Sequence, residues 1–375
     1  MEFYRHSLTD EDIAEVVDVL RGVFLTTGPR TAAVETSLAQ YLGIQRVVGL
    51  TSCTAALFLG LKALGVGPDD EVITTPMTFI ATSNAILHAG ATPVFVDVEP
   101  ETGNLDVEQV ERAITPRTRG VLPVHLYGLM VDIKRLAELC RRRDLFLLED
   151  AAHALEASRD GVRPGELGDA ACFSFYATKN LTCGEGGAVA TNRQDVAEAI
   201  RGLRTHGMST NAAQRYTGRY QHWDMVDLGY KANMFDIQAA LLINQLPRLA
   251  GQLERRETIA RRYAAAFGEI PGLDFPRVPE SARSARHLFT IWVPPERRDE
   301  TVWRLQEAGI GVAVNYRAVH LLTYYRERFG FERGAFPHAE RIGDSTITLP
   351  LYPKMSDDDV EAVITAVRQV TKNWR

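Results

Sequence analysis

Two polar residues, a lysine and an aspartate, follow apolar segments that are typical of buried strands. Lys179 comes shortly after the run 170–176, and Asp150 directly follows the run 145–149. Residues just past the C-terminal ends of parallel strands meet at one edge of a sheet, which is where α/β proteins bind ligands. A lysine amine can hold an aldehyde cofactor as a Schiff base, and a carboxylate can keep a pyridine nitrogen protonated. These two residues therefore indicate the chemistry of pyridoxal 5'-phosphate (PLP).

Each of these features also has a simpler interpretation. A lysine in the middle of a chain usually lies on the surface, and an aspartate after a strand often caps a helix. The pair Gly186-Gly187 often marks only a turn. However, a lysine in a surface loop does not usually follow an apolar run such as 171–176 so closely. These residues alone leave both a Schiff-base lysine and a surface lysine open.

A segment that could bind phosphate lies earlier in the chain. Residues 51–57 follow an apolar strand and open a helix, and they include hydroxyl side chains such as Thr54. The N-terminus of a helix favours anions, although a plain N-cap gives the same pattern. Ser174, five residues before Lys179, could add a hydroxyl to the same phosphate. Phe79 follows another strand and could stack on a planar ring, or it could belong to the core.

A histidine close to Asp150 is a further candidate. His153 lies three residues on, which is one turn if a helix begins there. It could donate a hydrogen bond to the phenolic oxygen of the cofactor. A capping or structural histidine is equally compatible with this position.

The elements that must position these residues alternate between strands and helices. This alternation predicts a mainly parallel, seven-stranded sheet covered on both faces, and thus an α/β fold. The expected strands are 47–50, 71–75, 93–98, 120–125, 145–149, 170–176 and 187–191, and the expected helices between them are 54–64, 79–88, 107–113 and 133–143.

The pattern changes after about residue 240. Residues 237–262 form one long, charged helical segment with leucines on one face, which we expect to link two domains. A small C-terminal α/β domain is expected beyond it. Its expected elements are the strands 287–293 and 311–314 and the helices 300–308 and 357–370. We therefore predict a large domain over residues 1–245 and a small domain, which includes the linker helix, over residues 246–375.

Bulk composition narrows the class of protein. The 375 residues are 45% hydrophobic and 24% charged, as in ordinary globular proteins. A net charge of −6 and a pI near 5.9 argue against nucleic acid or an anionic membrane as partner. No stretch is long and apolar enough for a transmembrane helix, and no signal peptide is recognisable. Four cysteines in this spacing indicate neither a disulfide framework nor a metal site, so we expect a cytoplasmic protein.

Several motifs together resemble one known family. They are Gly28-Pro29 and the segments 51–57, 78–85, 149–154, 173–187 and 228–240. With them the chain resembles the nucleotide-sugar aminotransferases of the DegT/DnrJ/EryC1/StrS family, in fold type I of the PLP enzymes, over nearly its whole length. Two positions depart from the family pattern. Cys53 stands where glycine is usual in the phosphate loop, and the segment around Lys231 differs from the commoner version.

The resemblance implies roles for individual residues. Lys179 is implied as the Schiff-base lysine and proton shuttle, and Asp150 as the partner of the pyridine nitrogen. The other implied cofactor-binding residues are His153 at the phenolic oxygen, Phe79 on the ring, Thr54, Ala55 and Ser174 at the phosphate, and Asn233 from the other subunit of a homodimer. The implied substrate-binding residues are Gly28, Tyr316 and His320, and no metal is implied.

The resemblance also implies a reaction. The amino group of L-glutamate would pass to a nucleotide-linked keto-deoxysugar, and the motif variant favours carbon C4 over C3. Arg219, Arg317 and backbone groups are all candidates for binding the carboxylate of glutamate.

Three other functions stay open beside it. A PLP-dependent sugar dehydratase shares the fold, but lysine is replaced by histidine in those relatives. An aldolase that forms a Schiff base without PLP would leave Asp150 unexplained. A non-catalytic regulatory protein would not need Lys179, Asp150 and Ser174 together.

Overall fold

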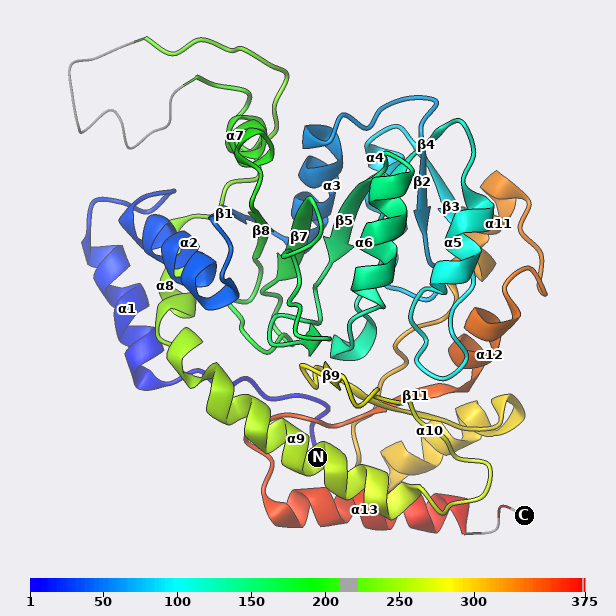
Figure 1. The fold of residues 1–375 in the computed structure, drawn as a ribbon. Coiled ribbons are helices and arrows are strands. Elements are labelled where there is room, and N and C mark those ends of the chain that lie inside the picture. Colours follow the sequence, from blue (N-terminus) through cyan, green and yellow to red (C-terminus); the bar gives the residue numbers. More distant parts are fainter. Residues whose placement is uncertain (210–221, 373, 375) are drawn as a thin grey trace.

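A central sheet with helices on both faces dominates the molecule (Figure 1). The computed structural model describes residues 1–209, 222–372 and 374, and within these residues seven strands form the sheet in the order β1-β8-β7-β5-β4-β2-β3. β8 runs antiparallel to its neighbours β1 and β7, and the remaining neighbours are parallel, as predicted. The bounds are β1 (Arg46–Leu50), β2 (Glu71–Thr74), β3 (Thr92–Phe95), β4 (Thr118–Val121), β5 (Phe146–Asp150), β7 (Ala170–Ser174) and β8 (Gly187–Thr191).

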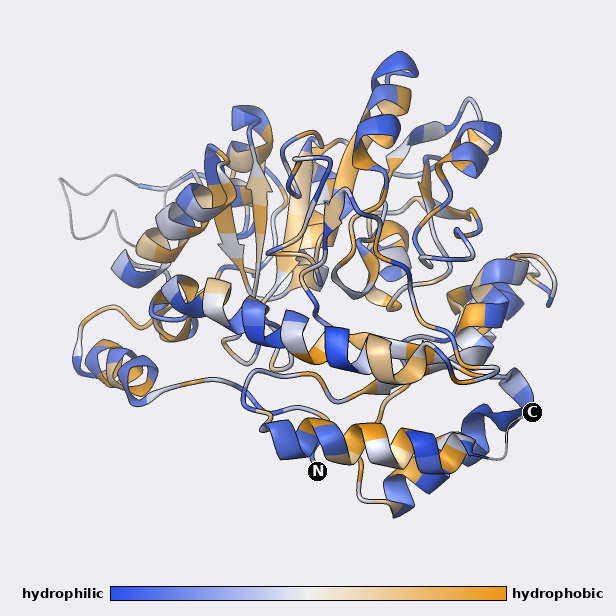
Figure 2. Cartoon of the chain, turned by 60° about the horizontal axis from the view of Figure 1, so that its bottom comes forward, coloured by the Kyte–Doolittle hydropathy of each residue, from blue (hydrophilic) through white to orange (hydrophobic). Residues whose placement is uncertain are grey.

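The apolar residues of the strands pack on both faces of the sheet, because successive side chains point to opposite sides. Val47 and Leu147 belong to the core on one face, and Val48 and Leu148 to the core on the other. In Figure 2 the strands of the sheet carry mostly the colours of hydrophobic residues. The first face is covered by α2 (Pro29–Leu42), α5 (Val107–Ala113), α6 (Ile133–Arg142) and α8 (Asp236–Ile243), and the second by α3 (Cys53–Ala63), α4 (Ala81–His88) and α7 (Gln194–Leu203). The helix α1 (Asp10–Arg21) packs against α8.

A separate hydrophobic core lies in the C-terminal part of the chain. It is built on the antiparallel pair β10 (Phe289–Trp292) and β11 (Thr346–Leu349), together with α9 (Leu249–Phe267), α10 (Arg298–Glu307) and α13 (Asp357–Thr371). Met1 and Tyr4, from the other end of the chain, pack against the same core. The division of the chain at residue 245 stays a prediction.

The structure corrects four details of the expected elements. The long helix expected over 237–262 is broken, because Pro247 has no N–H to bond the carbonyl of Ile243. α8 ends at Ile243, and α9 begins at Leu249 after a short 3-10 turn, Leu246–Arg248. The strand expected at 311–314 is reduced to one bridge, between Ala313 and Thr348. The helices α11 (Thr323–Phe329) and α12 (Pro337–Ser345) were not predicted, and a short pair, β6 (Ser158–Arg159) with β9 (Ala282–Arg283), was not predicted either.

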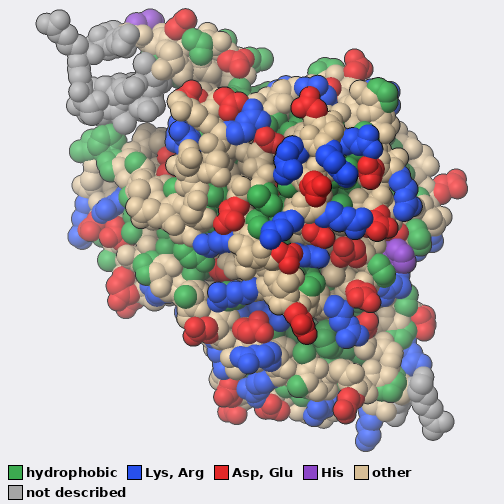
Figure 3. All heavy atoms as spheres, viewed as in Figure 1, with side chains coloured by type: hydrophobic (Ala, Val, Ile, Leu, Met, Phe, Trp, Pro, Cys, Tyr) green, Lys and Arg blue, Asp and Glu red, His purple; other side chains and the backbone are tan. Residues whose placement is uncertain are grey.

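The surface carries both signs of charge. On the face that Figure 3 shows, basic and acidic side chains are interspersed rather than gathered by sign. Among the described residues, no helix has both the length and the apolar character needed to cross a membrane.

Candidate active site

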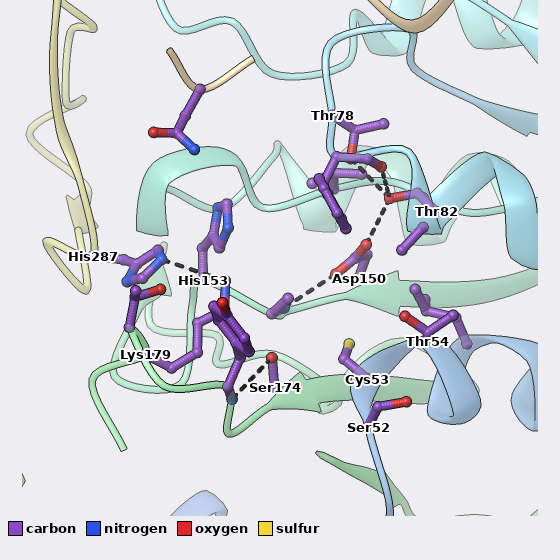
Figure 4. A pocket seen from close by; sticks show the side chains of 18 of the residues that line it. Ser52, Cys53, Thr54, Thr78, Thr82, Asp150, His153, Ser174, Lys179 and His287 are labelled. Carbon is purple, nitrogen blue, oxygen red and sulfur yellow. Dashed lines mark hydrogen bonds between the residues drawn. The ribbon is translucent and has the colours of Figure 1, made fainter. Parts of the chain in front are cut away.

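A cavity of about 520 Å³ lies at the edge of the sheet where β5 and β7 end. That is the edge at which open α/β sheets bind ligands, and the volume lies in the range typical of small-molecule sites. The cavity walls come from the start of α3, the segments after β2, β5 and β7, and the C-terminal part of the chain. Figure 4 shows Cys53 and Thr54 on one side and Lys179 and His287 on the other, with Asp150 above and Ser174 below.

Lys179 projects into this cavity from the loop between β7 and β8. Burial lowers the pKa of its amine to about 8, although Cys53 and Asp150 favour the charged form. At pH 7 roughly a tenth of such an amine is neutral, far more than for a solvated lysine. A neutral amine is a nucleophile, so Lys179 is suited to attack a carbonyl group.

Asp150 is the last residue of β5, and its side chain is almost fully buried. Thr82 donates a hydrogen bond to its Oδ2 (2.8 Å), and the backbone N–H of Ala152 donates one to its Oδ1 (3.1 Å). Burial raises the pKa of the carboxyl, while Thr82, Ala152 and Lys179 act against this shift. A cationic N–H group beside Asp150 would therefore be stabilised, because it would balance a buried negative charge.

The start of α3 forms the anion-binding part of the cavity. Ser52 caps this helix and accepts a hydrogen bond from the N–H of Ala55 (3.1 Å), and Thr54 lies in the first turn, exposed toward the cavity. Cys53 is the first residue of the helix, so its backbone conformation does not require the glycine that is usual there. Gly187 is needed instead, because a Cβ at this position would lie 2.3 Å from the carbonyl carbon of Ser52.

Two aromatic residues and a histidine form the wall next to Asp150. Phe79 lines the cavity and is 53% exposed, and its ring lies 5.7 Å from that of Tyr316. The hydroxyl of Tyr316 lies 3.2 Å from Nε2 of His153. His153 also accepts a hydrogen bond at Nδ1 from the backbone N–H of Tyr127 (3.2 Å). An aromatic ring as exposed as that of Phe79 offers a face on which a flat ligand can stack.

Among the residues that sequence reasoning missed are two that contact Lys179. Nε2 of His287 lies 3.4 Å from Nζ of Lys179, but the sequence indicated only that His287 begins a strand. The hydroxyl of Tyr4 donates to the backbone carbonyl of Lys179 (3.2 Å). Neither residue stands in a recognisable motif, and each is more than 100 positions from Lys179, so no local signal could have linked them to it.

Four predicted site residues do not line this cavity: Ala55, Gly28, Asn233 and His320. His320 is fully buried, with Nε2 3.0 Å from Oε1 of Glu340 and its ring packed on Phe336, and its contact with substrate stays a prediction. Gly28 and Asn233 lie together elsewhere. Asn233 donates to Oγ1 of Thr27 (2.7 Å), next to Gly28. The structure does not choose between the two arginines that could bind the carboxylate of the amino donor. Arg317 is exposed beside Tyr316, and Arg219 lies outside the described residues.

The residues of the cavity fit PLP. Its pyridinium nitrogen would balance the buried charge of Asp150, its ring would stack on Phe79, and its phosphate would accept from the helix N-terminus at Thr54. Lys179 would then hold its aldehyde carbon. Each of these requirements is met by a side chain or helix end that lines one cavity.

Comparisons with known proteins point the same way. Residues 6–368 match the model of the DegT/DnrJ/EryC1/StrS aminotransferase family. The chain is 45% identical to the spore coat polysaccharide biosynthesis protein SpsC of Bacillus subtilis, over 96% of this chain and 95% of that protein. Among solved structures it resembles Spr1654 of Streptococcus pneumoniae, a putative sugar aminotransferase, in its PMP form, with a TM-score of 0.93, 35% identity and 99% of both chains covered.

Related proteins have been solved both with and without the cofactor. Spr1654 has also been solved in apo and PLP forms. DesV of S. venezuelae, in complex with a ketimine intermediate, superposes with a TM-score of 0.90 at 36% identity, over 98% of this chain and 95% of DesV.

Proposed function

This chain belongs to the DegT/DnrJ/EryC1/StrS aminotransferase family, and on that premise we propose that it transfers the amino group of L-glutamate to carbon C4 of a nucleotide-linked keto-deoxysugar. It is a PLP-dependent sugar aminotransferase with an α/β fold of type I. The observation that carries the proposal is the cavity in which the amine of Lys179, with its lowered pKa, and the buried carboxyl of Asp150 face the same space.

The residues of the cavity divide the work of such a reaction. PLP supplies an electron sink that stabilises a carbanion on the substrate. Asp150 keeps the pyridine nitrogen protonated, because its buried carboxylate is stabilised by a positive partner. Lys179 first holds the cofactor. Once its amine is free, Nζ takes a proton from the carbon of the amino donor and later returns one to the sugar carbon.

The substrate class can be tested with a panel of acceptors. With glutamate as donor, we expect a nucleotide-linked 4-keto-6-deoxysugar to be aminated faster than the corresponding 3-keto sugar, and both faster than pyruvate or oxaloacetate. Mass spectrometry and NMR of the aminated carbon would identify the product. Amination at C3 alone would refute the proposed position but not the sugar specificity. A preference for free keto acids over every sugar would refute both.

The proposal includes a homodimer with shared sites. Asn233 and Gly28 lie side by side outside the cavity of their own chain, joined through Thr27. Exposed apolar side chains flank them in both segments, including Leu25, which is 49% exposed, and Leu228, which is 73% exposed. Exposed apolar groups of this kind mark association surfaces. This geometry supports a partner subunit whose cavity Asn233 would complete.

Subunit exchange tests the shared site. We expect a mixture of Lys179→Ala and Asn233→Ala proteins to gain activity over the two proteins measured alone, because one site of each mixed dimer would hold both intact residues. The matched control mixes Lys179→Ala with Asp150→Asn. Both of those residues line the cavity of their own chain, so every site of that mixed dimer is damaged and no gain is expected. A fully active monomer in sedimentation would contradict the proposal.

A further inference from the structure

His287 lies directly beside the amine that is proposed to transfer protons. It precedes β10 and is 5% exposed. Its Nε2 lies 3.4 Å from Nζ of Lys179 (Figure 4). A neutral imidazole carries a proton on one nitrogen and a lone pair on the other. What His287 can do for Lys179 therefore depends on which of its nitrogens carries the proton.

Neighbouring groups determine this tautomer. The Nδ2 amide of Asn180 donates to Oε1 of Glu156 (3.0 Å) and to the carbonyl oxygen of Ala285 (2.8 Å). Oδ1 of Asn180 therefore faces His287, 3.3 Å from its Nδ1. A carbonyl oxygen can only accept, so Nδ1 of His287 carries the proton and Nε2 presents its lone pair to Lys179.

The imidazole is also held neutral. Burial lowers the pKa of His287 well below its ordinary value, and the positive charges of Lys179 and Arg256 and the ring of His153 act in the same direction. Arg256 lies 3.7 Å from Glu156, the residue that orients Asn180. The groups around His287 thus favour an uncharged ring with a free lone pair at Nε2.

The histidine whose ring lies next to that of His287 has the opposite arrangement. The rings of His153 and His287 lie 4.5 Å apart, at 39° to each other. Nδ1 of His153 accepts from the N–H of Tyr127, so its proton is on Nε2, which faces the hydroxyl of Tyr316. His153 therefore presents a donor to the cavity, and His287 presents an acceptor to Lys179.

We propose that His287 is a positioning residue for the free amine of Lys179, held in its Nδ1–H tautomer by Asn180. A neutral amine has two N–H groups and one lone pair. When one N–H is donated to Nε2 of His287, rotation about the Cε–Nζ bond is restricted, and the lone pair that takes the substrate proton can be held toward the cavity. This role rests on the proposed transamination, because only there is the amine repeatedly released and recaptured.

The tautomer can be measured without any turnover. In the full-length chain with ¹⁵N-labelled histidine, both free of cofactor and loaded with pyridoxamine phosphate, we expect the His287 signals of a protonated Nδ1 and an unprotonated Nε2. His287→Gln assigns the signals by removing them. Asn180→Leu should abolish the preference for this tautomer. A proton on Nε2 in the wild type, or an unchanged tautomer in Asn180→Leu, would overturn the proposal.

The amine itself provides a second readout. In the cofactor-free chain, an amine reagent should label Lys179 faster as pH rises, because the ammonium loses its proton. The rate should follow a titration curve with its midpoint near pH 8. His287→Leu should lower this midpoint by about one pH unit, because an acceptor that stabilises the charged form is gone. His287→Gln, whose amide oxygen can still accept, should shift it less. His88→Gln, on an exposed residue at the end of α4, is the control and should not shift it.

Kinetics then separate positioning from packing. His287→Leu should lower kcat by on the order of 10²-fold with little change in KM, because misplacement of a reacting group affects the chemical step. His287→Gln should recover part of this loss. Equal activity of the two variants, or an unchanged labelling midpoint in His287→Leu, would overturn the proposal. The tautomer and labelling results need no sugar substrate, so a failure of the proposed function would be seen separately, in the acceptor panel.

Discussion

Turnover is expected to disappear in a Lys179→Ala variant. Proton transfer by a positioned side chain alone contributes about 10²- to 10⁴-fold, and the variant also loses the covalent attachment of the cofactor. The expected result is therefore activity at background level and loss of the visible absorbance band of the lysine-bound cofactor. The helix N-terminus at Thr54 remains, so some cofactor should still bind through its phosphate.

The matched control for this variant is Lys134→Ala. Lys134 is an exposed lysine of α6, outside the cavity, and its replacement should leave both the rate and the spectrum unchanged. The two measurements are glutamate-dependent turnover and the absorbance spectrum of the purified protein. Near-normal turnover of Lys179→Ala would falsify the central claim about this site.

Asp150→Asn is expected to lower the rate by on the order of 10²-fold or more. That is the usual effect of removing one group that stabilises charge in the transition state. An amide is nearly isosteric with the carboxylate. Its oxygen can accept from the N–H of Ala152, and its NH2 group can donate to the hydroxyl oxygen of Thr82, so the fold should persist. It cannot keep a pyridine nitrogen protonated, because it carries no charge. The loss should therefore appear in kcat, with the cofactor still bound.

Asp97→Asn separates this electrostatic effect from simple capping. Asp97 is also a buried carboxylate, and it accepts from the backbone N–H groups of His338 and Ala339 at the start of α12, outside the cavity. Its replacement should lower stability, measured as Tm, and leave kcat nearly unchanged. If Asp150→Asn behaved like Asp97→Asn, the role of Asp150 would be reduced to that of a structural cap.

The large sheet and the two central residues could be predicted because their signals are local. The seven predicted strands all appear, each within a few residues of the expected bounds. Lys179 and Asp150 could be placed at one sheet edge, because parallel strands bring their C-terminal ends together. The break between α8 and α9 follows from Pro247, which cannot continue a helix, although the leucine periodicity runs across it without interruption.

The remainder of the site depends on packing between distant segments. His287 reaches Lys179 across 108 positions of sequence, and Tyr4 does so across 175. His320 shows the converse case. The resemblance implied a substrate contact for His320, and the structure buries it fully against Glu340 and Phe336, which α12 brings next to it. Contacts of this kind follow from the assembled fold and leave no mark on the residues nearby in sequence.

The antiparallel strand β8 has a consequence for the order in which the chain folds. β1 lies at the edge of the sheet, and its neighbour in the described structure is β8, whose register pairs Arg46 with Thr191. A ribosome that adds about 5–20 residues per second needs on the order of ten seconds to make the intervening segment. The strands β2, β3, β4 and β5 can pair with one another during that time, whereas the apolar strand β1 has no partner strand yet. Until β8 emerges, β1 lacks its partner in the sheet, and an unpaired strand edge can pair with another chain.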